Sequence, residues 1–178
     1  MQRSAEHEEA FKRVYDHVYP IIFRIAYRIT GSTDVAEELC QEAFIKYYER
    51  LDSFPDQDQA KYWLIRVAKN LALNVAKRSG RERRAYERAY HEPRDPSSSG
   101  EDLVIRQEEA VRVQNALEIL PEKLKSVLVL KEYGDLNYKE IASILGITEG
   151  NVKVRVFRAR ERLMKALLEP GAGEQDDA

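Results

Sequence analysis

Cationic side chains near the C-terminus have the types and spacing needed to bind nucleic acid. Lys153, Arg155, Arg158 and Arg162 recur within a few residues of one another along one predicted helix. Arginine pairs with guanine N7 and O6, and both cations hold phosphate. Between Lys139 and Lys165, seven Lys and Arg stand against three Glu. A solvated basic helix without base contacts is the alternative for this segment.

A second basic segment lies earlier in the chain and contains aromatic residues. From Lys61 to Arg94 there are ten Lys and Arg against three Glu, although the whole chain has a formal net charge of −2. Two basic segments on an acidic background indicate two separate contacts with a polyanion. For either segment alone, a solvated helix face is an equally good explanation.

The sequence shows no pattern for catalysis, metal binding or membrane insertion. Its three histidines are scattered, its single cysteine allows no zinc-ligand spacing, and it has no phosphate-binding glycine loop. Cys40 is expected to be a buried thiol, in keeping with a reducing compartment. No apolar run approaches the roughly 20 residues that span a bilayer, and the N-terminus does not resemble a signal peptide. We expect a cytoplasmic, non-enzymatic protein without cofactor, metal or membrane insertion.

Apolar spacing predicts helices through the first half of the chain. Apolar residues recur at helical intervals in three segments, residues 11–29, 35–51 and 63–75. Gly31 is expected to end the first helix, and Ser32 or Thr33 to cap the second. The third runs into the basic residues 77–84 (KRSGRERR).

Three other segments have the composition of irregular structure. Residues 52–59 (DSFPDQDQ) predict a loop, residues 91–102 (HEPRDPSSSGED) a flexible linker, and residues 169–178 a disordered tail. A second helical block is expected from about Leu103 to Leu168. The predicted fold is all-α, with two small helical modules joined by the linker.

The second block contains the signature of a DNA-binding helix-turn-helix. Asn137 and Glu140 have the spacing of a capping box, and Thr148 can cap the following helix. Ala142 is small enough for close helix crossing, Gly146 suits the turn, and Val152 returns to the shared core. The inward stripe of the last helix is predicted to be Val152, Val156, Ala159 and Leu163.

These segments resemble extracytoplasmic function (ECF) sigma factors of bacterial RNA polymerase. Residues 120–163 (LPEKLKSVLVLKEYGDLNYKEIASILGITEGNVKVRVFRARERL) resemble region 4 of that family. Residues 36–54 (AEELCQEAFIKYYERLDSF) and 61–78 (KYWLIRVAKNLALNVAKR) resemble region 2. The resemblance covers residues 10–168, with no folded region 3 between the two. It implies a region 2 bundle of three to four helices at 10–90, a linker at 91–108 and region 4 at 109–168.

The resemblance implies an alternative sigma factor. Such a protein binds core RNA polymerase and directs promoter-specific initiation by recognising the −35 and −10 elements and aiding strand opening. The implied partners are the β′ clamp helices and β flap of core polymerase, promoter DNA as duplex and as melted single strand, and an anti-sigma factor.

The resemblance also assigns individual residues. The implied polymerase contacts are Glu38, Gln41, Glu42 and Phe44. The implied −10 residues, in a base-capturing loop and along the single strand, are Ser53, Phe54, Lys61, Tyr62, Arg66, Lys69 and Asn70. The implied −35 residues are Lys153, Arg155, Phe157, Arg158 and Arg162. Between the two adjacent aromatics, Tyr62 is the better candidate for base stacking, and Trp63 is expected in the core.

Two other functions are compatible with parts of the sequence. An operator-binding helix-turn-helix regulator would dimerise and read a palindrome, but it has no need of the basic aromatic helix at 61–78. A protein that mimics sigma factors without binding DNA is disfavoured by the basic charge on both modules.

Overall fold

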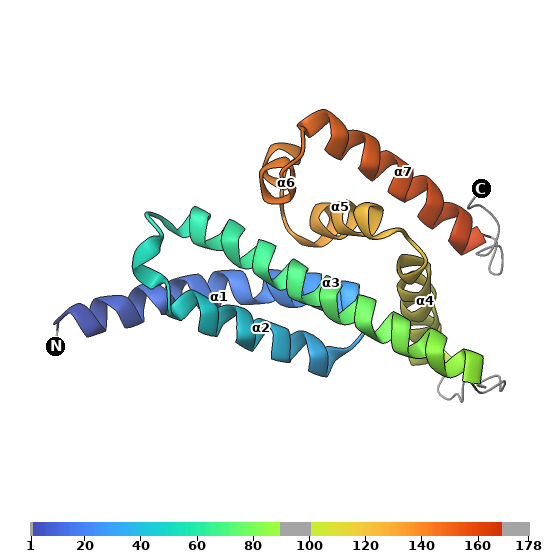
Figure 1. Cartoon of the computed structure of the whole chain (residues 1–178), viewed down its shortest axis with the longest axis horizontal. Coiled ribbons are helices and arrows are strands. Elements are labelled where there is room, and N and C mark those ends of the chain that lie inside the picture. Colours follow the sequence, from blue (N-terminus) through green and yellow to red (C-terminus); the bar gives the residue numbers. More distant parts are fainter. Residues whose placement is uncertain (1, 90–100, 169–178) are drawn as a thin grey trace.

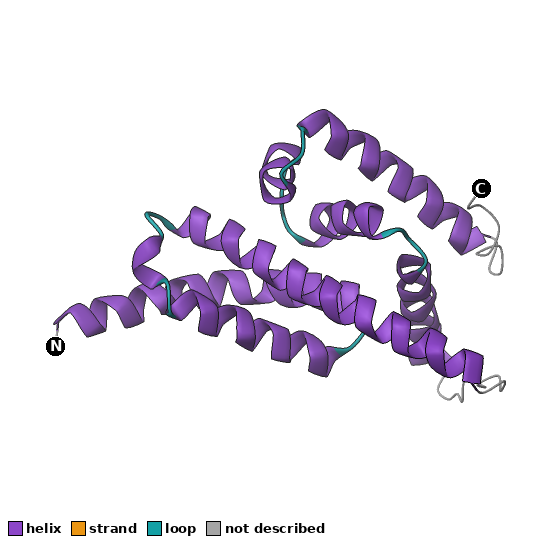
Figure 2. Cartoon of the chain, in the orientation of Figure 1, coloured by secondary structure: helices purple, strands orange, loops and turns teal. Residues whose placement is uncertain are grey.

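The computed structural model describes residues 2–89 and 101–168, and these ranges are helical and contain no strand. The helices are α1 (Gln2–Thr30), α2 (Thr33–Tyr48), the short 3₁₀ helix η1 (Leu51–Ser53), α3 (Gln57–Ala89), α4 (Glu101–Glu118), α5 (Glu122–Tyr133), α6 (Tyr138–Leu145) and α7 (Glu149–Leu168). This confirms the predicted all-α fold (Figures 1 and 2). None of the described helices is long and apolar enough to cross a membrane.

The first module is a bundle of α1, α2 and α3, which lie side by side in Figure 1. A fully buried aliphatic stripe on α1, including Ile22, Ile25 and Ile29, fills its centre. Burying one such side chain contributes about 1.5–3 kcal/mol, so this stripe contributes several kcal/mol to the bundle's stability. A second stripe on α1 is aromatic, with neighbouring ring centroids 5.2–6.4 Å apart, and consists of Phe11, Tyr15, Tyr19, Phe23 and Tyr27.

The second module consists of α4 to α7. Val127 and Leu130 of α5 pack with Ile141 of α6 and Val152 of α7, and all four are fully buried. A smaller cluster joins α4 to α5 and α7 through Leu117, Leu128 and Ala159. The three helices α5, α6 and α7 therefore share one core, and α4 closes its far end.

The two modules pack against each other along α1 and α3. Helix α5 and the end of α4 lie against α1, and α6 lies against α3 (Figure 1). Polar contacts cross the same boundary: Arg24 forms an ion pair of 2.9 Å with Asp135, and Gln114 Nε2 donates to the Arg28 carbonyl over 3.2 Å. We call this packing of the second module on α1 and α3 the closed arrangement.

Several predicted boundaries are corrected by the structure. The first helix begins at Gln2, well before residue 11. The predicted loop 52–59 is shorter, because η1 occupies its start and α3 begins at Gln57. Asp56 Oδ1 accepts a hydrogen bond of 2.8 Å from the Gln59 amide, so an acid that suggested a loop caps the helix instead.

The expected linker and tail fall largely outside the described residues. Helix α4 begins at Glu101, so the last part of the range 91–108 is helical, whereas residues 90–100 and 169–178 are not described. The division into region 2 at 10–90 and region 4 at 109–168 stays a prediction.

The two ends of the α6–α7 turn allow a matched test of backbone conformation. Gly146 has φ +66°, and a Cβ there would meet nothing within 4 Å, so only conformational strain opposes alanine. Gly146→Ala should lower the free energy of unfolding by about 1 kcal/mol. Gly150 lies inside α7 in equally open space, so Gly150→Ala should raise it by about 0.5 kcal/mol. Urea denaturation measures both, and shifts of the same sign would contradict this account.

Candidate nucleic-acid interface

Helices α6 and α7 form a complete helix-turn-helix. Asn137 Oδ1 accepts from the Glu140 amide over 2.9 Å, and Glu140 Oε2 accepts from the Asn137 amide over 2.6 Å. The predicted capping box is therefore confirmed at the start of α6. Gly146 ends α6 in the left-handed conformation, and Thr148 Oγ1 accepts from the Asn151 amide at the start of α7. These bonds fix the angle at which α7 leaves the turn.

Helix α7 is anchored by its inner face and displays its cations on the outside. Val152, Val156 and Ala159 are buried, and Leu163 is half-buried, as predicted. Of the expected −35 residues, four are exposed: Lys153, Phe157, Arg158 and Arg162. The fifth, Arg155, is half-buried and faces the boundary with the first module.

Two residues that sequence reasoning did not identify help to hold α7 in place. The Tyr138 ring lies 5.9 Å from Lys153 Nζ, which also pairs with Glu149 at 3.0 Å. Arg160 Nη2 binds Glu132 Oε1 over 2.6 Å and so joins α7 to α5. Because α7 contains several other cations, the sequence does not indicate that Arg160 in particular pairs with another residue of the protein.

The loop expected to capture a −10 base is anchored by its aromatic residue. Ser53 is exposed at the end of η1, but the Phe54 ring lies 5.4 Å from Tyr47 and 5.3 Å from Trp63. Trp63 is half-buried against the core, which confirms its expected packing role. The exposed part of the loop is therefore Ser53, Pro55 and Asp56, with Phe54 beneath them.

Two of the −10 residues expected on α3, Tyr62 and Arg66, contact the second module. Tyr62 Oη donates to Glu140 Oε1 over 2.5 Å. The Arg66 guanidinium donates to the Ile144 carbonyl over 3.1 Å and to the Ser143 carbonyl over 2.9 Å. Both partners belong to α6, so the first helix of the helix-turn-helix lies on these α3 side chains.

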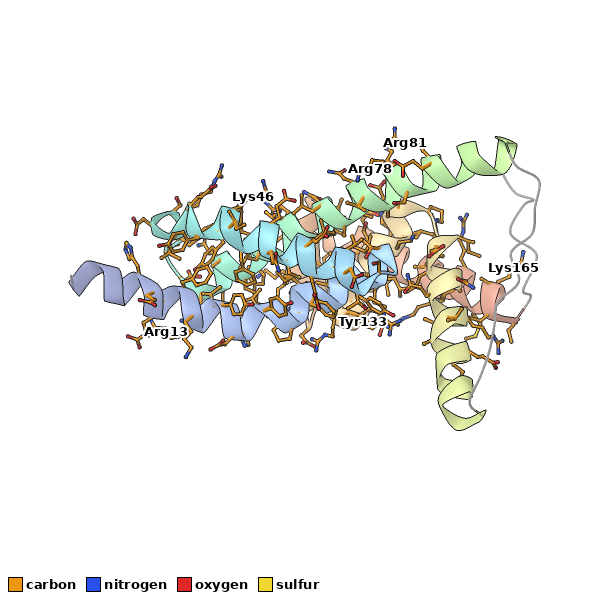
Figure 3. All side chains as sticks on the ribbon, turned by 90° about the horizontal axis from the view of Figure 1, so that it is seen from below. Arg13, Lys46, Arg78, Arg81, Tyr133 and Lys165 are labelled. Carbon is orange, nitrogen blue, oxygen red and sulfur yellow. The ribbon has the colours of Figure 1, made fainter. Side chains whose placement is uncertain are left out.

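Farther along α3, Lys69 and Asn70 open onto a cavity of about 390 Å³ between the modules. Glu122 and Lys123 of α5 and Arg155 of α7 line its other sides. One cavity thus holds residues expected to read the −10 strand and a residue expected to read the −35 duplex. Lys61, near the start of α3, is half-buried. Toward the other end of α3, past the cavity, Arg78 and Arg81 point away from the bundle (Figure 3).

The contact between Tyr62 and Glu140 changes the protonation of both groups. The hydrogen bond to Glu140, followed by burial and nearby carboxylates, raises the pKa of Tyr62 to about 12. Partial burial pushes the pKa of Glu140 upward, but the bonds from Tyr62 and the Asn137 amide, with Lys61 and Lys131 nearby, leave that pKa below its usual value. At neutral pH the pair is therefore a phenol donating to a carboxylate. Burial lowers the pKa of Lys69.

On α2 the structure corrects one of the residues expected to contact polymerase. Glu38, Gln41 and Glu42 are exposed together, but Phe44 is only 4% exposed and packs 4.7 Å from the Tyr15 ring. Its side chain belongs to the core and cannot reach a partner.

The apolar groups beside the α2 acids are two residues that were missed. Ile45 is 61% exposed and Tyr48 is 64% exposed. Together with Gln41 they follow the i, i+4, i+7 spacing of a single helix face, and this signal is present in the sequence. On the other side of α2, Cys40 is buried as expected, and burial raises the pKa of its thiol to about 12.

Comparison with known proteins finds two family matches along the chain. Residues 14–82 match the family Sigma-70 region 2, and residues 110–163 match the family Sigma-70, region 4. The ECF RNA polymerase sigma factor SigW of Bacillus subtilis is 32% identical over 90% of this chain and 90% of its own length. The ECF RNA polymerase sigma-E factor of Escherichia coli is 36% identical over 76% of this chain and 75% of its own length.

A solved structure supports the relationship. The sigma factor RpoE of Bartonella quintana, in complex with the anti-sigma factor NepR, has a TM-score of 0.65 and 28% identity over 89% of this chain and 96% of that one. Sequence and structure therefore agree on both modules and their order. The chain belongs to the ECF family of RNA polymerase sigma factors.

Proposed function

We propose that the two modules of this sigma factor read the two promoter elements with the residues described above. A sigma factor of this family binds core RNA polymerase and directs promoter-specific transcription initiation. The observation that carries the assignment is that one chain combines a complete helix-turn-helix, with cations on its outer helix, and a second basic helix with an exposed loop beside it. An operator-binding regulator needs only the first of these, so that alternative is not favoured.

In the second module, α7 is proposed to enter the major groove of the −35 element. Its exposed Lys153 and Arg158 lie near the N-terminal half of the helix, where recognition helices contact base edges. Arg162 lies one turn farther on and suits a phosphate contact. Arg155 is available to DNA only when the second module moves away from α3, since it now lines the cavity between the two modules.

In the first module, the loop after η1 and the stripe along α3 are proposed to hold the melted −10 strand. Unstacking a base costs a few kcal/mol, so a site that holds the extruded base stabilises the open duplex. Ser53 and Phe54 supply the loop, while Lys61, Tyr62, Arg66, Lys69 and Asn70 follow the strand. Cations for phosphates interleaved with an aromatic ring are typical of single-strand sites.

The exposed face of α2 is proposed to bind the β′ clamp helices of core polymerase. Three polar residues, Glu38, Gln41 and Glu42, surround the exposed Ile45, with Tyr48 one turn farther along. An apolar centre with a polar rim is the usual composition of a protein interface. The β flap of polymerase is the other contact that the family resemblance implies.

We also propose that an anti-sigma factor regulates this protein and that it acts in the cytoplasm without catalysing a reaction. A supporting observation is that the similar RpoE structure was solved with the anti-sigma factor NepR.

Run-off transcription tests the function itself. Core RNA polymerase is supplied with the DNA upstream of the gene for this chain, with and without the purified protein. A discrete transcript that requires the protein is expected, and its start site locates both promoter elements. A footprint of the protein alone on a symmetric duplex, with no transcript, would contradict the proposal.

The −35 assignment predicts separable effects of substitutions on α7. Arg155→Ala and Arg158→Ala should each weaken holoenzyme binding to the mapped promoter, by about 1–3 kcal/mol where a base contact is lost. Loss of a phosphate contact should instead lower the salt dependence of binding by about 0.9 in the log–log slope. Binding to core polymerase should not change.

Arg13→Ala is the control for the −35 substitutions, because Arg13 is an exposed arginine on α1 of the first module (Figure 3). Promoter binding is measured by fluorescence anisotropy and polymerase binding by gel filtration. Equal loss of both activities in the α7 variants would mean that α7 has only a structural role.

A further inference from the structure

We propose that α6 of this chain is a built-in competitor of the −10 strand: it docks on the same α3 side chains and keeps the free protein closed. This inference rests on the proposed −10 role of α3. It adds a self-inhibitory contact that needs no other protein, located at Tyr62, Arg66 and the two ends of α6.

The first half of the contact is at the N-terminus of α6. Glu140 uses Oε2 to accept the Asn137 amide in the capping box and Oε1 to accept the Tyr62 hydroxyl. One carboxylate therefore closes the helix end and joins it to α3. Because the acceptor is ionised and the phenol is protonated, this is a charge-assisted hydrogen bond, the stronger kind.

The second half is at the C-terminus of the same helix. The last carbonyls of a helix lack partners within the helix and carry the negative end of its dipole. The Arg66 guanidinium donates to two of them, those of Ser143 and Ile144. Tyr62 and Arg66 are one turn apart on α3, and their partners Glu140 and Ile144 are one turn apart on α6. The two helices therefore match in register, and both ends of the eight-residue α6 are held.

Further contacts support this position without involving residues assigned to DNA. Arg24 of α1 pairs with Asp135 in the turn before α6. The Arg28 guanidinium lies 4.8 Å from the Tyr133 ring, and the Arg28 carbonyl accepts from Gln114 of α4. These contacts come from α4, α5 and the α5–α6 turn, so the whole second module is placed on α1 and α3.

The closed arrangement and promoter binding exclude each other for two reasons. The Tyr62 hydroxyl and two of the Arg66 N–H groups already donate to α6, so a strand can use these donors only after α6 leaves. In addition, the −35 and −10 positions are about 25 base pairs apart, which is about 85 Å along B-DNA at about 3.4 Å per base pair. Arg155 and Asn70, which are assigned to these two elements, now line one cavity. A closed chain therefore cannot contact both elements.

Weakening the contact should increase the strand affinity of the free protein. Glu140→Gln keeps a residue that can complete the capping box but removes the charge that Tyr62 binds. Asp135→Asn removes the ion pair to Arg24 at a separate point. If the closed state dominates, the apparent affinity is the intrinsic affinity multiplied by the open fraction, so Glu140→Gln should tighten strand binding about three- to tenfold. Asp135→Asn should tighten it less, by up to about fivefold, because the Arg24–Asp135 pair is exposed. Glu132→Gln is the control, because Glu132 pairs with Arg160 inside the second module.

The probe is a fluorescein-labelled single strand with the non-template −10 sequence located by run-off transcription. Its dissociation constant is measured by anisotropy for the full-length protein alone and for the protein bound to core polymerase. Tighter binding by Glu140→Gln and Asp135→Asn, but not Glu132→Gln, in the free protein only, supports the inference. Parent-like binding by both Glu140→Gln and Asp135→Asn in the free protein overturns it.

The closing comparison separates this inference from the proposed function. Arg66→Ala should weaken strand binding by the polymerase-bound protein, where α6 no longer competes. If it does so while Glu140→Gln and Asp135→Asn have no effect, the −10 role stands and self-inhibition is wrong. If polymerase-bound Arg66→Ala and Tyr62→Ala both bind the strand like the parent, the −10 role itself fails, and the inference fails with it.

Discussion

Packing around α1 determines where the functional side chains of this protein can lie. Its aliphatic stripe is fully buried, and α3 satisfies it with Leu64, Ala68 and Ala72. Because these residues must face inward, Tyr62 and Arg66 fall along another edge of the same helix. The stripe proposed to hold the promoter strand is therefore a geometric consequence of core packing in the first module.

That edge of α3 has one set of hydrogen-bond donors and two possible partners. Helix α6 carries a carboxylate at one end and unpaired carbonyls at the other, at the spacing of Tyr62 and Arg66. These acceptor groups of α6 resemble those of a nucleic acid strand, which also presents anionic and carbonyl oxygens. In the proposed mechanism, the promoter strand on the polymerase-bound protein takes the place of α6 on Tyr62 and Arg66. This exchange links the fold of the free chain to its function in transcription.

Much of this could be predicted from the sequence, wherever local rules decide the outcome. The capping box at Asn137, the left-handed turn at Gly146 and the buried Val152 all follow from short-range spacing, and all are confirmed. The family resemblance then placed the two modules in order. The resemblance assigned Phe44 to polymerase together with three polar neighbours, but helical geometry turns its side chain to the core and exposes Ile45 instead. The contacts of Tyr62 and Arg66 could not be predicted, because they join residues 77 and 78 positions apart and depend on how two modules pack.

The most direct test of this account is the distance between the modules before and after polymerase binds. Spin labels at Arg13→Cys and Lys165→Cys place one probe on α1 and one on α7, both exposed (Figure 3), while the native Cys40 is buried and protonated. Double electron–electron resonance of the free protein should give a narrow distribution at the separation seen in the closed arrangement. Core polymerase with promoter DNA should shift that distribution to a clearly longer distance. A broad distribution in the free protein, or the same distance in both states, would contradict the account.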